Sequence, residues 1–599
     1  MKVNALAELQ KELKIRLNDV SIRYSGKGYR VDCIDGKTEI ACENNVQLAK
    51  ALVEVKKRKG CPQYQISGQP LLESMGVMFD VSRNAVLNAE SVKHLIRLSA
   101  LMGYNRVMLY MEDIYDIENR PYFGYLRGKY SKDELRDFDE YASAFDVELI
   151  PCIQTLAHLG TVKKWWTLGD MFDVNDILLC DDEKTYAFIE DMFVALRSCL
   201  KTKRINIGMD EADMVGLGKY LKLHGFSDKF DLLLRHLNRV CEIAKKYSFE
   251  PMMWSDMFFR IANDGDYYGK NEIPGDVKKK VPEEVSLVYW DYRSTDTEHY
   301  DRMIRSHNSF QNQVIVANTA WKCTGFAPHN RFTFRTFDAL FPAMQKNKVR
   351  HFFTTCWGDN GAECSIYSVL PSLVYIAGKC YSGEFDFEEN FYAITGVKLD
   401  QFLALDALNE LGGLQLKNES PSKYFLYNDL FFGYLDTRYN DKFKEDIRSA
   451  GKRLEKVDAE EYRPVFETLK ALCDVLEIRM GLGIETRKAY QNGDRDRILS
   501  LCKNEYPLLI EKLEVFHDKL FAQWMRENKP HGFEVQDIRL GGLIQRTKTC
   551  LLRLEKYLNT SERLPELEET ILPFHWRNDD PASHIDIFNW SNFVTVNNI

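Results

Sequence analysis

Short apolar runs alternate with longer amphipathic stretches through the middle of the chain. Eight of these runs have the length of a buried strand, and the stretches between them repeat apolar residues at the three- and four-residue spacing of a helix. The runs are 76–81, 106–111, 148–153, 204–208, 250–254, 286–289, 313–318 and 351–356. Eight consecutive βα units predict an α/β fold of the (β/α)8 TIM-barrel type.

A doubly wound open sheet is the alternative arrangement of βα units. Such a sheet usually has fewer strands, and a glycine-rich phosphate turn commonly follows its first strand. Neither a GxGxxG nor a GxxxxGK[ST] pattern follows any of the eight runs. The barrel is therefore favoured.

The residues before the barrel predict a small α/β domain over 1–70. Strands are expected at 20–24, 29–34 and 38–42, with Asp35-Gly36 as a type I′ hairpin turn, and a helix at 45–57. Pro62, Gly68 and Pro70 indicate a linker over 60–70.

After about residue 380 the strand pattern ends and helical spacing takes over. Helices are expected at 441–456, 462–480, 494–501, 506–526 and 540–558. We therefore divide the chain into 1–70, a barrel domain over 71–380 and a helical domain over 381–599. The aromatic residues near the chain end are expected to pack back on the body; they are Phe574, Trp576, Phe588, Trp590 and Phe593.

Composition narrows the possible partners. A chain of 599 residues is too long for a single hydrophobic core. The net charge is −9 and the sequence has no strongly basic block, which argues against nucleic acid or a membrane surface as partner. No apolar stretch is long enough for a membrane span, and the start has no secretion signal. The large helical domain offers surface for a possible homodimer.

The fourteen cysteines are scattered, without a CxxC or a Cys/His cluster at zinc spacing. Reduced thiols in the core of a cytoplasmic protein are the simplest interpretation. No metal and no cofactor are expected.

In a barrel of this type the site forms at the carboxyl ends of the strands. The residues found there are Asp80 and Arg83 after the first strand, Glu112 and Asp113 after the second, Gln154 and His158 after the third, Asp210 and Glu211 after the fourth, Trp254 and Asp256 after the fifth, Trp290 and Asp291 after the sixth, Asn318 and Trp321 after the seventh, and Trp357, Asp359 and Asn360 after the eighth.

Single acids after a strand often cap the next helix, so Asp113, Asp256 and Asp291 fit loop hydrogen bonding as well as a site. Four indoles at one end of a barrel are harder to explain in that way. Trp offers a flat apolar face and one N–H donor, which suits the C–H face of a pyranose ring. The pattern points to a sugar site.

The segment Ile207-Gly-Met-Asp210-Glu211 resembles the strand-four motif of glycoside hydrolase family 20, the β-N-acetylhexosaminidases. Gly76 to Arg83, His158, Met253-Trp254 and Trp357-Gly-Asp359 are similar to further motifs of that family in order and spacing. The helical C-terminal part, with its segment 532–542, looks like a divergent bacterial branch. Asn206 and Met209 depart from the family motif.

The resemblance implies an exo-acting hydrolase of terminal β-linked GlcNAc or GalNAc with a retaining, substrate-assisted mechanism. Asp210 would orient the acetamido group and Glu211 would be the general acid and base. The residues expected to bind the substrate, an oligosaccharide or glycoside, are Glu73, Asp80, Arg83, Gln154, His158, Trp254, Tyr289, Trp290, Tyr292, Asn318, Trp321, Trp357 and Asp359. Glu73 is included because Met75 stands where the family has a sugar-binding arginine.

Two other functions remain open at this point. A two-carboxylate β-glycosidase would use Glu211 as acid and Asp359 or Glu112 as nucleophile. A sugar-binding protein without activity is the other, suggested by Asn206 and Met75.

Overall fold

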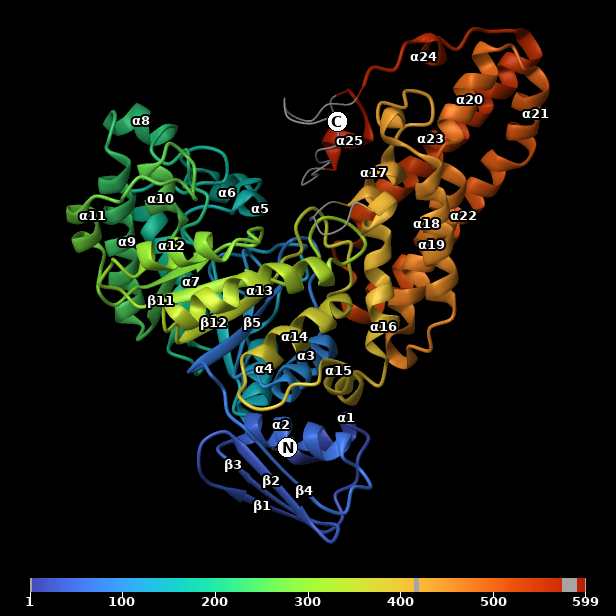
Figure 1. Cartoon of the computed structure of the whole chain (residues 1–599). Helices are drawn as coiled ribbons and strands as arrows, with labels where there is room; N and C mark the ends of the chain where they lie inside the picture. The colour runs from blue at the N-terminus through green and yellow to red at the C-terminus, as the bar shows by residue number, and fades with distance from the viewer. Residues whose placement is uncertain (1–2, 414–419, 574–589, 598) are drawn as a thin grey trace.

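The computed structural model describes residues 3–413, 420–573, 590–597 and 599. Figure 1 shows a small sheet at the N-terminal end, a barrel surrounded by helices, and an elongated helical region beside the barrel. The predicted fold class is confirmed: eight parallel strands close into a barrel in the order β10-β11-β12-β5-β6-β7-β8-β9.

The N-terminal part contains α1 (Ala5–Glu12), α2 (Asn45–Lys57) and a sheet of order β1-β3-β2-β4. Its strands are β1 (Val20–Tyr24), β2 (Tyr29–Ile34), β3 (Lys37–Cys42) and β4 (Tyr64–Gly68). Asp35 and Gly36 have φ of 50° and 79°, as the type I′ turn between β2 and β3 requires. The predicted linker is wrong, because β4 lies within 60–70 and pairs antiparallel with β2.

The barrel strands match the eight predicted runs to within two residues at either end. They are β5 (Ser74–Asp80), β6 (Arg106–Tyr110), β7 (Glu148–Cys152), β8 (Arg204–Asn206), β9 (Glu250–Trp254), β10 (Ser286–Trp290), β11 (Val314–Thr319) and β12 (His351–Cys356). Because all eight are parallel, their carboxyl ends meet at one end of the barrel.

Helices cover the outside of the barrel and fill the connections between strands. They are α3 (Ala89–Met102), α4 (Lys132–Ala144), α5 (Gly160–Lys163), α6 (Trp166–Gly169), α7 (Glu183–Arg197), α8 (Lys219–His224), α9 (Lys229–Lys246), α10 (Asp256–Ala262), α11 (Gly275–Lys280), α12 (Thr297–His307), α13 (Asn330–Lys346) and α14 (Leu370–Lys379). Local signals set their ends. The side chain of Asn88 caps α3 at its start, and Gly103 ends it with a φ of 101°.

Side chains alternate between two cores along each barrel strand. Met78 of β5 and Met108 of β6 belong to the cluster inside the barrel, whereas Val77 and Phe79 belong to the larger cluster between strands and helices. Both faces of a strand are therefore apolar, which is usual for parallel sheets covered by helices.

The C-terminal region is helical, as predicted. Its helices are α15 (Phe387–Thr395), α16 (Leu399–Phe402), α17 (Pro421–Tyr427), α18 (Asp441–Glu455), α19 (Arg463–Arg479), α20 (Leu482–Gln491), α21 (Arg495–Lys503), α22 (Glu505–Glu527), α23 (Phe533–Thr560), α24 (Pro565–Glu568) and α25 (Ser591–Val594). Of the aromatic tail, Trp590 contacts Tyr427 of α17 at a ring distance of 5.9 Å. Phe574, Trp576 and Phe588 lie outside the described residues, as does the side chain of Phe593.

All fourteen cysteines fall in the described ranges, where each is a free thiol and all but Cys61 are buried. None of the helices in those ranges combines the length and apolar character needed to span a membrane.

Candidate active site

The turn after β8 places two adjacent carboxylates at the barrel end. Gly208, Met209 and Glu211 have φ of 72°, 75° and 54°, so the chain reverses sharply just beyond the strand. A Cβ atom at Gly208 would lie 2.8 Å from the Ile153 carbonyl oxygen, a backbone atom, so a side chain at this position would force the chain to shift. The tight turn lets both Asp210 and Glu211 reach the cavity.

Asp210 is a buried carboxylate held by two neighbours. Gln154 Nε2 donates to Asp210 Oδ1 at 2.9 Å, and His158 Nε2 lies 3.2 Å from Asp210 Oδ2. Burial opposes ionisation, but the charge and hydrogen bond of His158, with the bond from Gln154, lower the pKa of Asp210 below its ordinary value. Asp210 is therefore the anion of the site.

Glu211 has the opposite electrostatic character. Its side chain is 46% exposed to the cavity, and its backbone N–H donates to Asp256 at 3.0 Å. Burial and the charge of Asp210 raise the pKa of Glu211, against the lowering effects of His158 and Arg260. Glu211 therefore keeps its proton at higher pH than an ordinary glutamic acid.

His158 lies between the two carboxylates, with Nε2 at 3.2 Å from Asp210 and 3.6 Å from Glu211. Burial disfavours its charged form, but Asp210 outweighs burial and raises the pKa of His158 to about 9. The imidazolium is thus the cation that keeps Asp210 ionised.

A cavity of about 490 Å³ opens above these groups. Its aromatic lining consists of Trp254, Tyr268, Trp290, Tyr292, Trp321 and Trp357. Its charged lining consists of Arg83, His158, Asp210, Glu211, Arg260, Arg293 and Asp359. A cavity that combines aromatic surface with converging charged groups is typical of a ligand site.

The aromatic rings of the lining pack against each other, and two of the indole N–H groups have no hydrogen-bond partner in the part of the chain that the structure describes. Trp254 lies 5.9 Å from Trp357, and Trp290 lies 5.2 Å from Tyr292, measured between ring centroids. The Nε1 atoms of Trp254 and Trp290 are buried and have no hydrogen-bond partner among the described residues. Buried N–H groups usually find a partner, so a ligand that accepts hydrogen bonds would satisfy them.

Arg83 forms a network of ion pairs in the cavity wall. Its guanidinium forms ion pairs with Asp359 at 2.9 Å, with Glu112 at 3.0 Å and with Asp80 at 3.3 Å. It also lies over the Tyr110 ring at 4.7 Å. Asp359 keeps a third of its side-chain surface exposed and so remains available to a ligand hydroxyl.

Two family models match separate parts of the chain. Residues 75–320 match the catalytic domain of glycosyl hydrolase family 20, and residues 400–586 match the glycoside hydrolase 20C C-terminal domain. Together the two matches span more than half of the chain. This chain belongs to glycosyl hydrolase family 20. It is a glycoside hydrolase.

Relatives of this family 20 hydrolase include two proteins named Hexosaminidase D. The Bos taurus protein is 26% identical over 347 residues, which is 53% of this chain and 94% of the relative. The Homo sapiens protein is 26% identical over 218 residues, or 34% of this chain and 41% of the relative.

Solved structures of low sequence identity share the fold. The GH20 exo-β-N-acetylglucosaminidase of Vibrio harveyi has a TM-score of 0.51 at 15% identity, covering 68% of this chain and 72% of its own. The β-N-acetylhexosaminidase of Bacteroides fragilis has a TM-score of 0.50 at 14% identity, covering 68% and 88%.

The structure brings most of the predicted residues of the family 20 hydrolase to the cavity wall. These are Arg83, His158, Asp210, Glu211, Trp254, Trp290, Tyr292, Trp321, Trp357 and Asp359. Asp80 and Gln154 lie behind the wall instead. Asp80 accepts from Gly358 N at 2.9 Å and from Arg83 N at 3.1 Å, and Gln154 donates to Asp210. Asp80 and Gln154 therefore support the site rather than line it.

The expectation for Glu73 is wrong. It precedes β5, at the amino end of the barrel strands, where it forms an ion pair with Arg350. Met75 is also far from the carboxyl end and belongs to the outer core. Neither residue lines the cavity, where Arg83 is one of the cations.

The expectations for Tyr289 and Asn318 are also wrong. Both are buried away from the cavity lining, and Tyr289 donates its hydroxyl to Asp291 at 3.2 Å. Strand alternation directs the next residues inward, so Trp290 and Thr319 line the cavity instead. Of the two tyrosine candidates, Tyr292 is the one that reaches it.

Five lining residues were missed by sequence reasoning: Arg260, Tyr268, Arg293, Thr319 and Cys323. Arg260 lies one helical turn after Asp256, to which its Nε donates at 2.9 Å, and that i,i+4 spacing could have indicated it. Tyr268 sits on a long connection after β9, where no pattern marked it.

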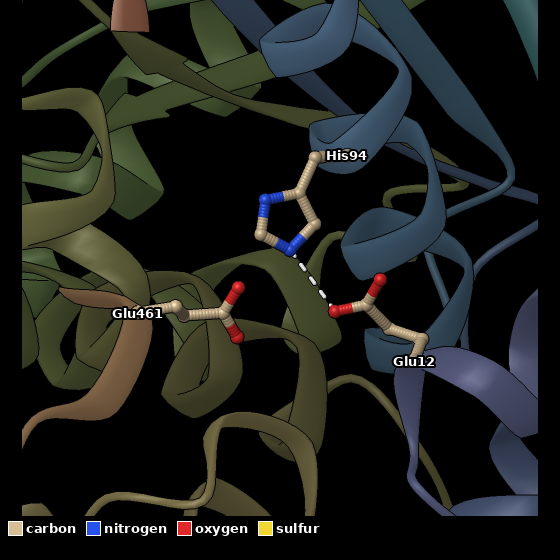
Figure 2. Close-up of side chains that lie close together, drawn as sticks. All are labelled: Glu12, His94 and Glu461. Atoms are coloured by element: carbon tan, nitrogen blue, oxygen red, sulfur yellow. Dashed lines mark hydrogen bonds and ion pairs between the residues drawn. The ribbon is translucent and has the colours of Figure 1, made fainter. Parts of the chain in front are cut away.

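A second cluster of ionisable groups lies where the N-terminal part, the barrel and the helical region meet. Figure 2 shows His94 of α3 near Glu12 of α1 and Glu461 of η5 (Glu460–Tyr462). Their ligand atoms lie within 4.8 Å of one another, a spacing that could hold a metal ion. Arg97 already pairs with Glu12 at 2.8 Å, so we interpret the cluster as an ion-paired junction.

Proposed function

We propose that this family 20 hydrolase is an exo-acting β-N-acetylhexosaminidase that removes terminal β-linked GlcNAc or GalNAc. The supporting observation is the pair of adjacent carboxylates with opposite pKa shifts at the edge of an aromatic cavity. A retaining, substrate-assisted reaction needs one carboxylate ionised and one protonated at the same time. The Hexosaminidase D relatives also support it.

In the first step the acetamido carbonyl oxygen attacks the anomeric carbon while the bond to the leaving oxygen breaks. Asp210 accepts the acetamido N–H and balances the positive charge of the oxazolinium ion that forms. Glu211 gives its proton to the leaving oxygen, which departs as the neutral alcohol.

In the second step water attacks the same carbon and reopens the oxazolinium ring. Glu211, now ionised, takes the proton of that water and returns to its starting state. Two displacements at one carbon give a product with retained configuration. His158 and Gln154 hold Asp210 in place throughout.

The aromatic residues bind rather than react. Trp254, Trp290 and Trp357 would enclose the acetamido group and the sugar ring, and the free indole N–H groups would donate to its oxygens. Asp359, fixed by Arg83, would accept from a ring hydroxyl.

The two competing functions receive less support. Arg83 holds both candidate nucleophiles, Asp359 and Glu112, and Glu112 does not line the cavity. Met75, which suggested the inactive binding protein, lies in the outer core, and Arg83 supplies a cation to the cavity wall.

The test is release of 4-nitrophenol from its β-N-acetylglucosaminide, β-N-acetylgalactosaminide and β-glucoside. We expect cleavage of the two acetamido sugars only, with the first product detected by NMR in the β configuration. Cleavage of the β-glucoside, or an inverted first product, would contradict the mechanism. Sugar binding without cleavage of any of the three would favour the binding protein.

From the sequence alone we also propose a cytoplasmic location, descent from a divergent bacterial branch of the family, and a homodimer through the helical region. The domain limits that we propose are 1–70, 71–380 and 381–599. Size-exclusion chromatography with light scattering tests the homodimer, since a single protomer mass would contradict it.

A further inference from the structure

The loop after β12 carries two residues of the cavity, Trp357 and Asp359, and then takes an unusual path. Asn360, Gly361 and Ala362 have φ of 56°, 107° and 51°, which places three consecutive residues in the left-handed region. Only glycine adopts that region freely. Such a path persists only where surrounding groups hold it.

Two of the side chains that hold the loop come from α23 of the C-terminal region. Arg539 Nη1 donates to the carbonyl of Asn360 at 2.8 Å and pairs with Glu363 at 2.8 Å. One turn earlier, Gln536 Nε2 donates to the carbonyl of Gly361 at 2.9 Å. The carbonyls of two of these three consecutive residues are thus bound by one helix.

The acid that ends the loop is anchored deep in the same region. Glu363 pairs with Lys423 of α17 at 2.6 Å, and both side chains are 2% exposed. Arg539 occupies its other oxygen. A buried carboxylate with two cationic partners has little freedom to move, because losing either partner would leave a buried charge uncompensated.

The amino end of α23 also contacts the segment after β5 that carries Arg83. Asn84, next to Arg83, donates Nδ2 to the carbonyl of Gly532 at 2.9 Å and to that of Gly361 at 3.2 Å. A Cβ atom at Gly532 would lie 2.3 Å from the Asn84 carbonyl oxygen, so the approach is close. One helix end therefore supports both partners of the Arg83–Asp359 ion pair.

We propose that Arg539 is a positioning residue for sugar binding, and that the C-terminal helical region completes the active site through it. Arg539 holds the strained loop so that Asp359 meets Arg83 and Trp357 closes the aromatic wall. It does not touch the sugar. The inference rests on the proposed function, because it assigns a sugar-binding role to Asp359 and Trp357.

The test compares two arginines of the same helix. Arg539→Ala removes the loop contact, whereas Arg546→Ala removes an ion pair with Asp429, at 2.6 Å, that lies seven residues further along α23 and does not involve the loop. We expect kcat/KM for the 4-nitrophenyl acetamido substrate to fall about 10- to 100-fold in Arg539→Ala and to change less than about twofold in Arg546→Ala. Circular dichroism establishes that each variant is folded.

Two readouts separate positioning from general stability. N-acetylglucosamine binding, followed by tryptophan fluorescence, should weaken in Arg539→Ala but not in Arg546→Ala. In a cycle with Asp359→Asn, the double variant should lose less than the product of the two single losses, because both act through Asp359. Arg539→Lys keeps the charge opposite Glu363 and should recover part of the activity.

Equal losses in Arg539→Ala and Arg546→Ala, or losses that multiply fully in the cycle, would overturn the inference while the proposed function stands. If the wild type neither cleaves acetamido sugars nor binds N-acetylglucosamine, the proposed function fails and the inference fails with it. Binding without cleavage would overturn the hydrolase function alone, and the fluorescence comparison would still decide the role of Arg539.

Discussion

Two clusters in this protein combine one histidine with two carboxylates. At the barrel end, His158 lies within 3.6 Å of Asp210 and Glu211. At the junction of the three parts of the chain, His94 lies 3.0 Å from Glu12, with Glu461 nearby (Figure 2). The residue types are the same, but the surroundings differ.

The two clusters differ in the cations that pair with their carboxylates. Arg97 and His94 together lower the pKa of Glu12 to about 2, although burial alone would raise it. Among the described residues, Asp210 pairs with His158 but with no arginine, and burial together with the charge of Asp210 raises the pKa of Glu211. A neutralised cluster stabilises the fold, whereas an unbalanced one beside a cavity can transfer protons.

The largest effect is expected for a change in the barrel-end cluster of His158, Asp210 and Glu211. Glu211→Gln removes the proton donor, so kcat/KM on a GlcNAc disaccharide should fall by about 10²- to 10⁴-fold. The loss should be much smaller with a 2,4-dinitrophenyl leaving group, which needs no proton. An equal loss on both substrates, measured in parallel assays, would argue against an acid role for Glu211.

Asp210→Asn should lower kcat/KM by about 10²- to 10³-fold, because it removes the anion that balances the oxazolinium charge. Binding of a thiazoline analogue of that ion should weaken in the same variant, as measured by inhibition of the wild-type reaction and by calorimetry for the variant. Unchanged thiazoline affinity would show that Asp210 does not face the intermediate.

The pH profile sharpens the comparison further. Glu211 must be protonated, so kcat/KM falls as pH rises through its raised pKa; Asp210 must be ionised, so kcat/KM falls as pH drops through its lowered pKa. His158→Gln removes the cation that lowers the pKa of both carboxylates. Both limbs of the profile should therefore move to higher pH, and limbs that stay in place would exclude His158 from this role.

A change in the junction cluster of His94, Glu12 and Glu461 should lower the stability of the fold and leave activity unchanged. The folded pKa of Glu12 lies below its unfolded value, so its contribution is present above pH 4.5 and is lost as pH falls towards 2. Replacing it in Glu12→Gln should cost about 3 kcal/mol at pH 6.5 and about half of that at pH 3.5, measured by urea unfolding.

The matched control is Glu90→Gln, which removes an exposed partner of the same Arg97. An exposed pair contributes little, so the cost should stay below about 1 kcal/mol at either pH. A loss of activity in Glu12→Gln at full folding would contradict the assignment of this cluster to stability.

Local sequence patterns determined much of the architecture. The eight barrel strands, the Asp35-Gly36 hairpin and the main helices beyond residue 440 were predictable because each depends on spacing within about twenty residues. The Asp210-Glu211 pair and the strand-end tryptophans were predictable for the same reason, since parallel strands bring their carboxyl ends together whatever the helices do.

Tertiary structure alone decided which side chains face the cavity. Barrel strands are apolar on both faces, so periodicity could not show that Trp290 and Thr319 point inward while Tyr289 and Asn318 point outward.

The support of the loop after β12 was equally hidden. Arg539 contacts Asn360 across 179 positions of sequence, and no local pattern links them. Sequence patterns reflect the propensity and periodicity of each helix or strand. Contacts between distant helices and strands depend instead on how these elements pack in the folded chain. The residues that we propose to react were therefore predictable from the sequence, whereas the geometry that holds them depends on the packing of the helical region against the barrel.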